Sequence, residues 1–252
     1  MRGIGLGLGM ALLLTAASAH ADELTVSAAA SLSDAFREIG TAYEKANPGT
    51  QVHLNTAASG VLLQQIRNGA PVDVFASADE FTMDEAARAS LIDPARRHVF
   101  ARNTLVVVVP ITATTAPSRL QDLTGSAVQR IAVGNPQSVP AGRYAKAALE
   151  AARLWQPLSP KLITTQNVRQ ALDYVGRGEV DAGFVYGSDA STFKQRVRTA
   201  FTVPLSQPVN YPIAPVARSR HAAQAADFVA YVRSPGAQAI LRRYGFSAPD
   251  AR

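Results

Sequence analysis

The sequence has 252 residues, of which 47% are hydrophobic and 17% are charged, with 17 glycines and 15 prolines. This composition is typical of a globular protein and excludes a disordered, collagen-like or multi-span membrane chain. The lack of cysteine excludes disulfides, thiolate metal sites and cysteine nucleophiles. The formal net charge is +6, but the basic residues are scattered as single residues and pairs. Without a basic stripe and interleaved aromatic residues, we expect no nucleic-acid partner.

Residues 1–21 are predicted to be a cleavable signal peptide. Arg2 precedes an apolar run at residues 4–17 that is too short and too glycine-rich for a membrane span. The segment ends in Ala-His-Ala, a small-x-small pattern that signal peptidases cleave. We therefore expect cleavage after Ala21 and a mature protein in the periplasm. No cysteine follows the cleavage site to carry a lipid anchor.

Short apolar runs alternate with amphipathic helical patterns along the rest of the chain, which is typical of the α/β class. In the first part, strands are predicted at 24–28, 51–55 and 72–77, with helices at 32–46 and 59–68 and another that ends at 89. A second set has strands at 105–109, 131–133 and 182–186, with helices around 144–155 and 168–175. Two last helices are predicted at 222–233 and 235–244. We expect two lobes that are joined by short crossing strands.

The sequence carries none of the common catalytic motifs. It has no G-x-S-x-G elbow, P-loop or H-E-x-x-H, and no G-x-G-x-x-G after a strand. The histidines of the mature chain, His53, His98 and His221, have no metal-ligating partner three or four positions away. We therefore expect a protein that is not an enzyme and has no cofactor.

Two predicted helices begin at a serine that follows small residues. Residues 28–31 precede the first helix, and Asp34 follows Ser31 by three positions. Residues 57–60 precede the second helix, around Ser59. One interpretation is helix capping by the serines. The other is an anion site at the carboxyl ends of parallel strands, because small side chains leave the amides of helix N-termini accessible and the helix dipole is positive there.

Three later segments have features that suit the other side of such a site. Residues 139–142 begin a helix with a proline and small neighbours that expose the first amides, and an ordinary helix start is the alternative. Residues 166–169 begin another helix, with Asn167 as its cap. Residues 184–189 end a buried strand in Tyr186, whose hydroxyl either binds a ligand oxygen or finds a partner in the core.

Several ordered blocks of the sequence carry a family resemblance. The blocks are AAASL at 28–32, GAPVDVFASAD at 69–79, LVVVVP at 105–110, VPAGRYAK at 139–146, LSPKL at 158–162, VYGSDA at 185–190 and RYGF at 243–246. With them, nearly the whole mature chain resembles the periplasmic molybdate-binding proteins of molybdate uptake transporters, the ModA family. The resemblance implies that the ligands of the oxyanion are Ser31, Ser59, the amides of Ala141 and Val168, and Tyr186.

The resemblance also implies the two-lobed periplasmic-binding-protein (type II) fold, in which each lobe is a mostly parallel sheet flanked by helices and the ligand lies in the cleft. Lobe 1 would comprise residues 22–102 and 208–252, and lobe 2 residues 103–207, with crossings near Asn103 and Val209. The protein would capture molybdate or tungstate as a monomer and deliver it to an inner-membrane molybdate permease of the ABC type. Molybdenum would be held only as molybdate. A carrier of sulfate or another oxyanion is the alternative, and an enzyme on a similar fold is a weaker one.

Overall fold

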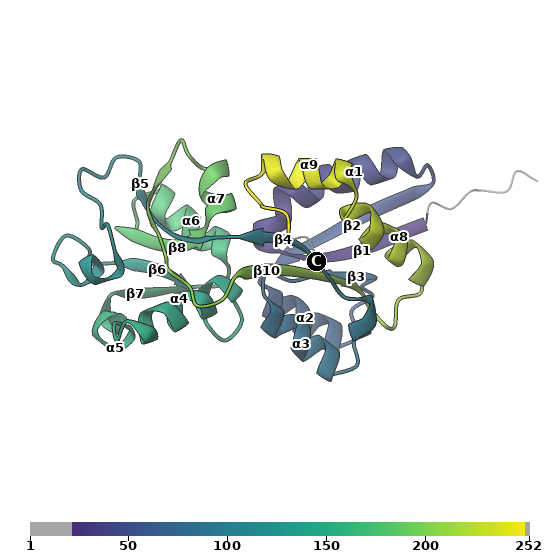
Figure 1. The fold of residues 1–252 in the computed structure, drawn as a ribbon, viewed down its shortest axis with the longest axis horizontal. Helices are drawn as coiled ribbons and strands as arrows, with labels where there is room; N and C mark the ends of the chain where they lie inside the picture. Colours follow the sequence, from purple (N-terminus) through teal and green to yellow (C-terminus); the bar gives the residue numbers. More distant parts are fainter. Residues whose placement is uncertain (1–21, 250–252) are drawn as a thin grey trace, which may run out of the picture.

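The structure, a computed structural model, describes residues 22–249 of the chain. The predicted signal peptide, with its cleavage site after Ala21, lies outside the described residues. Within them, two five-stranded sheets with their helices form two lobes along the long axis of the molecule (Figure 1). The predicted α/β class and two-lobed organisation are confirmed.

Each lobe is a sheet with helices packed on it. The strand order in lobe 1 is β2 (Thr50–Ala57), β1 (Asp22–Ala29), β3 (Val74–Ala76), β10 (Val209–Pro215) and β4 (His98–Asn103). Its α-helices are α1 (Ser33–Ala46), α2 (Ser59–Arg67), α3 (Glu80–Arg88), α8 (Ala222–Val232) and α9 (Pro235–Arg243). The order in lobe 2 is β7 (Leu162–Thr165), β6 (Ile131–Gly134), β8 (Ala182–Tyr186), β5 (Leu105–Pro110) and β9 (Val197–Thr202). Its α-helices are α4 (Pro140–Ala151), α5 (Trp155–Leu158), α6 (Val168–Gly176) and α7 (Gly187–Thr192).

The two sheets have the same mixed pattern of strand directions. In lobe 1, β1 pairs in parallel with β2 and β3, while β10 runs antiparallel to β3 and β4. In lobe 2, β6 pairs in parallel with β7 and β8, while β5 runs antiparallel to β8 and β9. Four of the five strands in each sheet therefore point the same way, and the prediction of mostly parallel sheets is confirmed. The strands that run the opposite way are β10 in lobe 1 and β5 in lobe 2, and each is the first strand after a crossing between the lobes.

Four strands of the structure, β4, β7, β9 and β10, lie in segments where the sequence predicted none. Two of them adjoin the crossings between the lobes (Figure 1). β4 ends at Asn103 and β5 begins at Leu105 in the other sheet, so one residue separates the two sheets along the chain.

The core of lobe 1 explains why α1 lies where it does. Phe36, Ile39 and Tyr43 are buried at spacings of three and four, so they share one face of the helix. Phe36 and Tyr43 pack edge to face against Phe228 of α8. This packing fixes the start of α1, where the candidate site lies. In residues 22–249, no helix has the length and apolar character that crossing a membrane requires.

Candidate functional site

A small cavity with about 200 Å³ of empty space lies between the two lobes. Its wall is formed by Ala29, Ala30, Ser31, Ala58, Ser59, Ala78, Val139, Pro140, Ala141, Val168 and Tyr186. These residues lie at or just after the carboxyl ends of the parallel strands β1, β2 and β3 in lobe 1 and β6, β7 and β8 in lobe 2. The structure thus brings all five predicted ligand residues together, at the strand ends where α/β sheets bind ligands.

Neither Ser31 nor Ser59 caps a helix. Ser31 is buried in a short 3-10 helix (Ala30–Leu32), and its Oγ lies 2.9 Å from the hydroxyl oxygen of Tyr211. Ser59 is the first residue of α2, and its Oγ accepts a hydrogen bond from the N–H of Ala78 at 3.0 Å. The capping interpretation is therefore wrong for both serines. Ser59 accepts with its oxygen, which leaves its own proton free to donate.

Lobe 2 contributes the starts of two helices. Ala141 is the second residue of α4, after Pro140, and Val168 is the first residue of α6. Amides in a first helical turn have no partner within their own helix, and the positive end of the dipole lies beside them. Asn167 caps α6 as predicted, because its Oδ1 accepts from the N–H of Gln170 at 3.0 Å.

Tyr186 ends β8 and reaches across to lobe 1. Its hydroxyl donates to the carbonyl oxygen of Ala78 at 3.4 Å, and its ring centroid lies 5.6 Å from that of Tyr211. Burial raises the pKa of the Tyr186 hydroxyl well above its usual range, so the group keeps its proton at neutral pH. Because the bond to Ala78 is long, a ligand oxygen can replace that acceptor at little cost.

Arg143 ties the lobes together on one side of the cavity. It lies on α4, and its Nε donates to Oδ2 of Asp79 at 2.8 Å while Nη2 donates to Oγ1 of Thr82 at 2.6 Å. Asp79 also caps α3, through the N–H of Thr82. Asp79 and Arg143 lie within the GAPVDVFASAD and VPAGRYAK blocks, which was the one signal in the sequence that pointed to them.

Arg169 makes the second charged link between the lobes. It follows Val168 on α6 and lies between Asp189, at 2.7 Å in lobe 2, and Asp34, at 2.8 Å in lobe 1. Burial raises the pKa of Asp189 to about 6, and the neighbouring Arg169 opposes this rise. The charges of Asp79 and Asp189 are thus each matched by an arginine near the cavity, and the wall itself carries no charged side chain.

The lobes also touch through backbone beside the cavity. The N–H of Gly60, in the first turn of α2, donates to the carbonyl oxygen of Ser138 at 3.0 Å. Together with the contacts of Arg143 and Arg169, this bond closes the lobes around the cavity.

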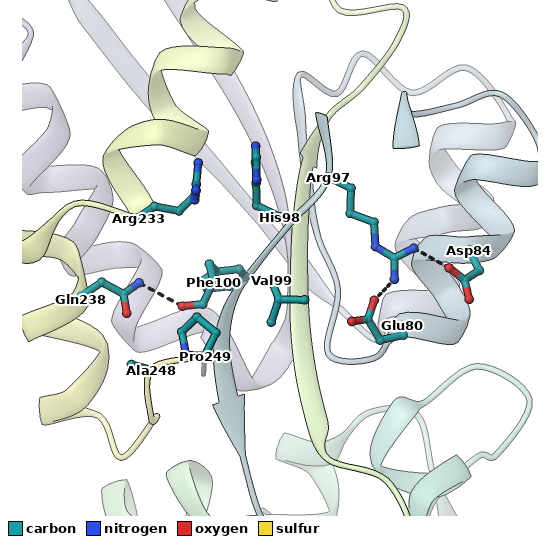
Figure 2. A pocket seen from close by; sticks show the side chains of 10 residues that line it. All are labelled: Glu80, Asp84, Arg97, His98, Val99, Phe100, Arg233, Gln238, Ala248 and Pro249. Carbon is teal, nitrogen blue, oxygen red and sulfur yellow. Dashed lines mark hydrogen bonds and ion pairs between the residues drawn. The ribbon is translucent and has the colours of Figure 1, made fainter. Parts of the chain in front are cut away.

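A larger groove lies elsewhere, within lobe 1. It has about 1590 Å³ of open space along β4, between α3 on one side and the turn from α8 to α9 on the other. Figure 2 shows Arg97 in this groove between Glu80 and Asp84. All its lining residues belong to lobe 1, and none is a predicted ligand residue. In the part of the chain that the structure describes, no three histidine, aspartate or glutamate side chains are grouped to hold a metal ion.

The donor atoms around the small cavity therefore define its chemistry. It offers hydroxyl groups and first-turn amides, and no carboxylate or ammonium group lines it. Such a wall suits an anion whose oxygens only accept hydrogen bonds, because helix N-termini bind anions without a counter-cation.

Comparisons with known proteins identify the family. The chain matches the model of the bacterial extracellular solute-binding proteins over residues 24–247. It is 41% identical to the molybdate-binding protein ModA of Escherichia coli, over 91% of each chain. The substrate binding domain of a putative molybdenum ABC transporter from Clostridium difficile is 32% identical with a TM-score of 0.69, over 90% of this chain and 99% of that one.

The fold alone does not specify the anion. The sulfate-binding protein SubI from Mycobacterium tuberculosis has a TM-score of 0.80 to this structure at 19% identity, over 91% of this chain and 88% of that one. Lobes, cavity and family model together define a two-lobed solute-binding protein. The chain belongs to the bacterial extracellular solute-binding proteins and, within them, to the ModA family of molybdate-binding proteins.

Proposed function

We propose that the protein binds molybdate in the cavity between its lobes, takes tungstate as well, and delivers the ion to an inner-membrane ABC-type permease. The observation that carries this proposal is the convergence of the five predicted ligand residues on one uncharged cavity, in a chain of the ModA family. The protein acts as a monomeric carrier in the periplasm after removal of residues 1–21, and it catalyses no reaction.

We further propose the division into lobes that the resemblance implies, with residues 22–102 and 208–252 in lobe 1 and 103–207 in lobe 2. The change of sheet between β4 and β5 supports the first crossing. Since the cavity wall comes from both lobes, a bound ion stabilises the closed state and shifts the population towards it.

The selectivity of the cavity tests the proposed function. Molybdate, tungstate and sulfate are fully deprotonated at pH 7, whereas phosphate carries a proton that needs an acceptor. Because the wall has no carboxylate, the proton of phosphate faces another donor. This mismatch weakens the free energy of phosphate binding by about 1–3 kcal/mol or more. Sulfate is smaller, and donors fixed on helices cannot contract onto it without longer hydrogen bonds. We expect tight molybdate and tungstate binding, much weaker sulfate binding and no detectable phosphate binding.

A thermal-shift and competition panel at pH 7 and 8 measures this order. A ligand present at 100 times its Kd adds about 2.7 kcal/mol to stability, which gives a clear shift in Tm. Displacement of molybdate by equimolar phosphate would contradict the all-donor cavity. Sulfate binding as tight as that of molybdate would instead make the protein a sulfate-type carrier.

Ser31→Ala and Ser59→Ala are each expected to weaken molybdate binding about tenfold to a hundredfold. Each change removes a hydroxyl on the cavity wall that can donate to a charged acceptor, a bond worth about 1.5–3 kcal/mol. Titration calorimetry measures the loss. The matched control is Ser234→Ala, because Ser234 caps α9 away from the cavity through the N–H of Ala237. The control should lower stability by about 1 kcal/mol and leave affinity unchanged. Unchanged affinity in both site variants would refute the ligand assignment.

A further inference from the structure

A row of hydrogen-bonded polar side chains, buried except at Asn103, lies behind Ser31, outside the cavity wall. The Oγ of Ser31 is 2.9 Å from the hydroxyl oxygen of Tyr211 on β10. That oxygen lies 3.3 Å from Nδ2 of Asn103, which ends β4 at the crossing between the lobes. Nδ2 also donates to Oγ of Ser188 on α7 at 2.7 Å. These hydrogen-bonded side chains thus connect the cavity, through lobe 1, to lobe 2.

The orientation of the Asn103 amide follows from its backbone partners. Its Oδ1 accepts from the N–H of Thr104 at 2.9 Å and from the N–H of Ser188 at 3.3 Å. A backbone N–H only donates, so the oxygen of the amide must face these two groups. The NH₂ group is therefore turned to Tyr211, and it can act there only as a donor.

This orientation sets the direction of the remaining bond. The Tyr211 hydroxyl accepts from Asn103, and its single proton needs an acceptor because the side chain is fully buried. Among the hydrogen bonds of residues 22–249, Oγ of Ser31 is the partner that remains for it. Ser31 then accepts from Tyr211, and the serine's own proton is left to point into the cavity.

We propose that Asn103 and Tyr211 are positioning residues that orient the hydroxyl proton of Ser31 towards the bound oxyanion. This inference rests on the proposed function of the cavity. Its physical advantage is that the donor is aligned before the ligand arrives, so little is lost in reorienting it. Because hydrogen bonds in a chain polarise one another, the bond from Ser31 to the anion is also strengthened.

Asn103→Asp reverses the direction of the hydrogen bonds from residue 103 to Ser31 and gives the sharpest test. The carboxylate keeps the size of the side chain and both backbone bonds, but it replaces the donor that faces Tyr211 with an acceptor. At pH 8 the Tyr211 proton then turns to residue 103, and Ser31 donates to Tyr211 instead of to the ligand. We expect molybdate affinity to fall by about tenfold to a hundredfold in titration calorimetry. Tyr211→Phe removes the orienting bond without adding a competing acceptor, so we expect a smaller loss of about threefold to tenfold.

Each change is repeated in a Ser31→Ala background to separate positioning from other effects. The repulsion between a carboxylate at position 103 and the anion persists there, whereas the effect on Ser31 disappears. In this background we expect the fold-loss of molybdate affinity caused by Asn103→Asp to be at least about five times smaller than with Ser31 present. We expect Tyr211→Phe to cause no further loss of affinity there. Tyr43→Phe is the matched control, since Tyr43 is a buried phenol of lobe 1 that packs against Phe228. It should leave affinity unchanged.

The outcomes distinguish the two proposals. If Ser31→Ala itself leaves molybdate affinity unchanged, the assigned cavity is wrong, and the positioning role fails with it. If Ser31→Ala weakens binding while Asn103→Asp and Tyr211→Phe cost the same with and without the serine hydroxyl, the positioning role alone is overturned. The Tm of each ligand-free variant shows that it is folded, and Tyr211→Phe keeps the test decisive should Asn103→Asp fail to fold.

Discussion

Replacing Arg169 with alanine is expected to destabilise the protein by about 3–5 kcal/mol, because it leaves a buried carboxylate without its partner. The side chain of Asp189 is fully buried, and Arg169 lies 2.7 Å from it. The same arginine reaches Asp34 in lobe 1 at 2.8 Å, so its loss also weakens the closed state. Urea unfolding of the ligand-free protein measures the first effect, and molybdate titration measures the second.

Two controls isolate the buried charge. Arg177 caps the other end of α6 and pairs with Glu179 at the surface, so Arg177→Ala should cost less than about 1 kcal/mol. The double variant Arg169→Met with Asp189→Asn removes both charges and should recover most of the stability. A loss in Arg169→Ala no larger than in Arg177→Ala would contradict the buried-pair explanation.

The Arg169–Asp189 pair also makes the loss of stability in Arg169→Ala depend on pH. Burial raises the pKa of Asp189 to about 6 in the folded protein, above the value of about 3.9 for an exposed aspartate. A raised carboxyl pKa costs stability at high pH, and this cost fades as pH falls from 6 towards 4, because the folded state takes up the proton first. Without Arg169 the pKa rises further, since the opposing charge is gone. The stability difference between wild type and Arg169→Ala should therefore narrow between pH 8 and pH 5, and a constant difference would refute this account.

The residues of the cavity wall could be predicted because they carry local signals. Small residues before Ser31 and Ser59 and a proline before Ala141 mark helix starts that leave amides exposed, and the family blocks include Ser31 and Ala141. Apolar runs then locate five of the six strands that lead into the wall, such as 182–186 before Tyr186, whereas β7 before Val168 was not predicted.

The residues that support the wall could not be predicted, because their contacts are distant in the sequence. Ser31 and Tyr211 are 180 positions apart, and Arg169 and Asp34 are 135 apart. No periodicity relates such pairs, and only the folded chain shows that they touch. β10 was missed for a local reason, because prolines at 212 and 215 are unfavourable in a strand and β10 has a register shift at Tyr211 and Pro212.

The contact at Gly60 leads to the second large effect, a loss of affinity without a loss of folding. A Cβ at position 60 would meet the carbonyl oxygen of Ser138 at 2.7 Å and its Cα at 2.9 Å. Both are backbone atoms of the other lobe, so no flexible side chain can move aside. Within lobe 1, alanine in the first turn of α2 is not strained, because Gly60 has no positive φ.

Gly60→Ala should therefore keep the lobes apart while leaving each lobe intact. The apparent Kd rises as the fraction of closed protein falls, so we expect at least tenfold weaker molybdate binding in calorimetry, with the ligand-free Tm unchanged or higher. Gly236→Ala is the matched control. Gly236 is the second residue of α9, as Gly60 is of α2, and its nearest neighbour is Oγ of Ser234 at 4.0 Å. The control should bind molybdate normally. Wild-type affinity in Gly60→Ala would show that the lobes do not close through this contact when the ion is bound.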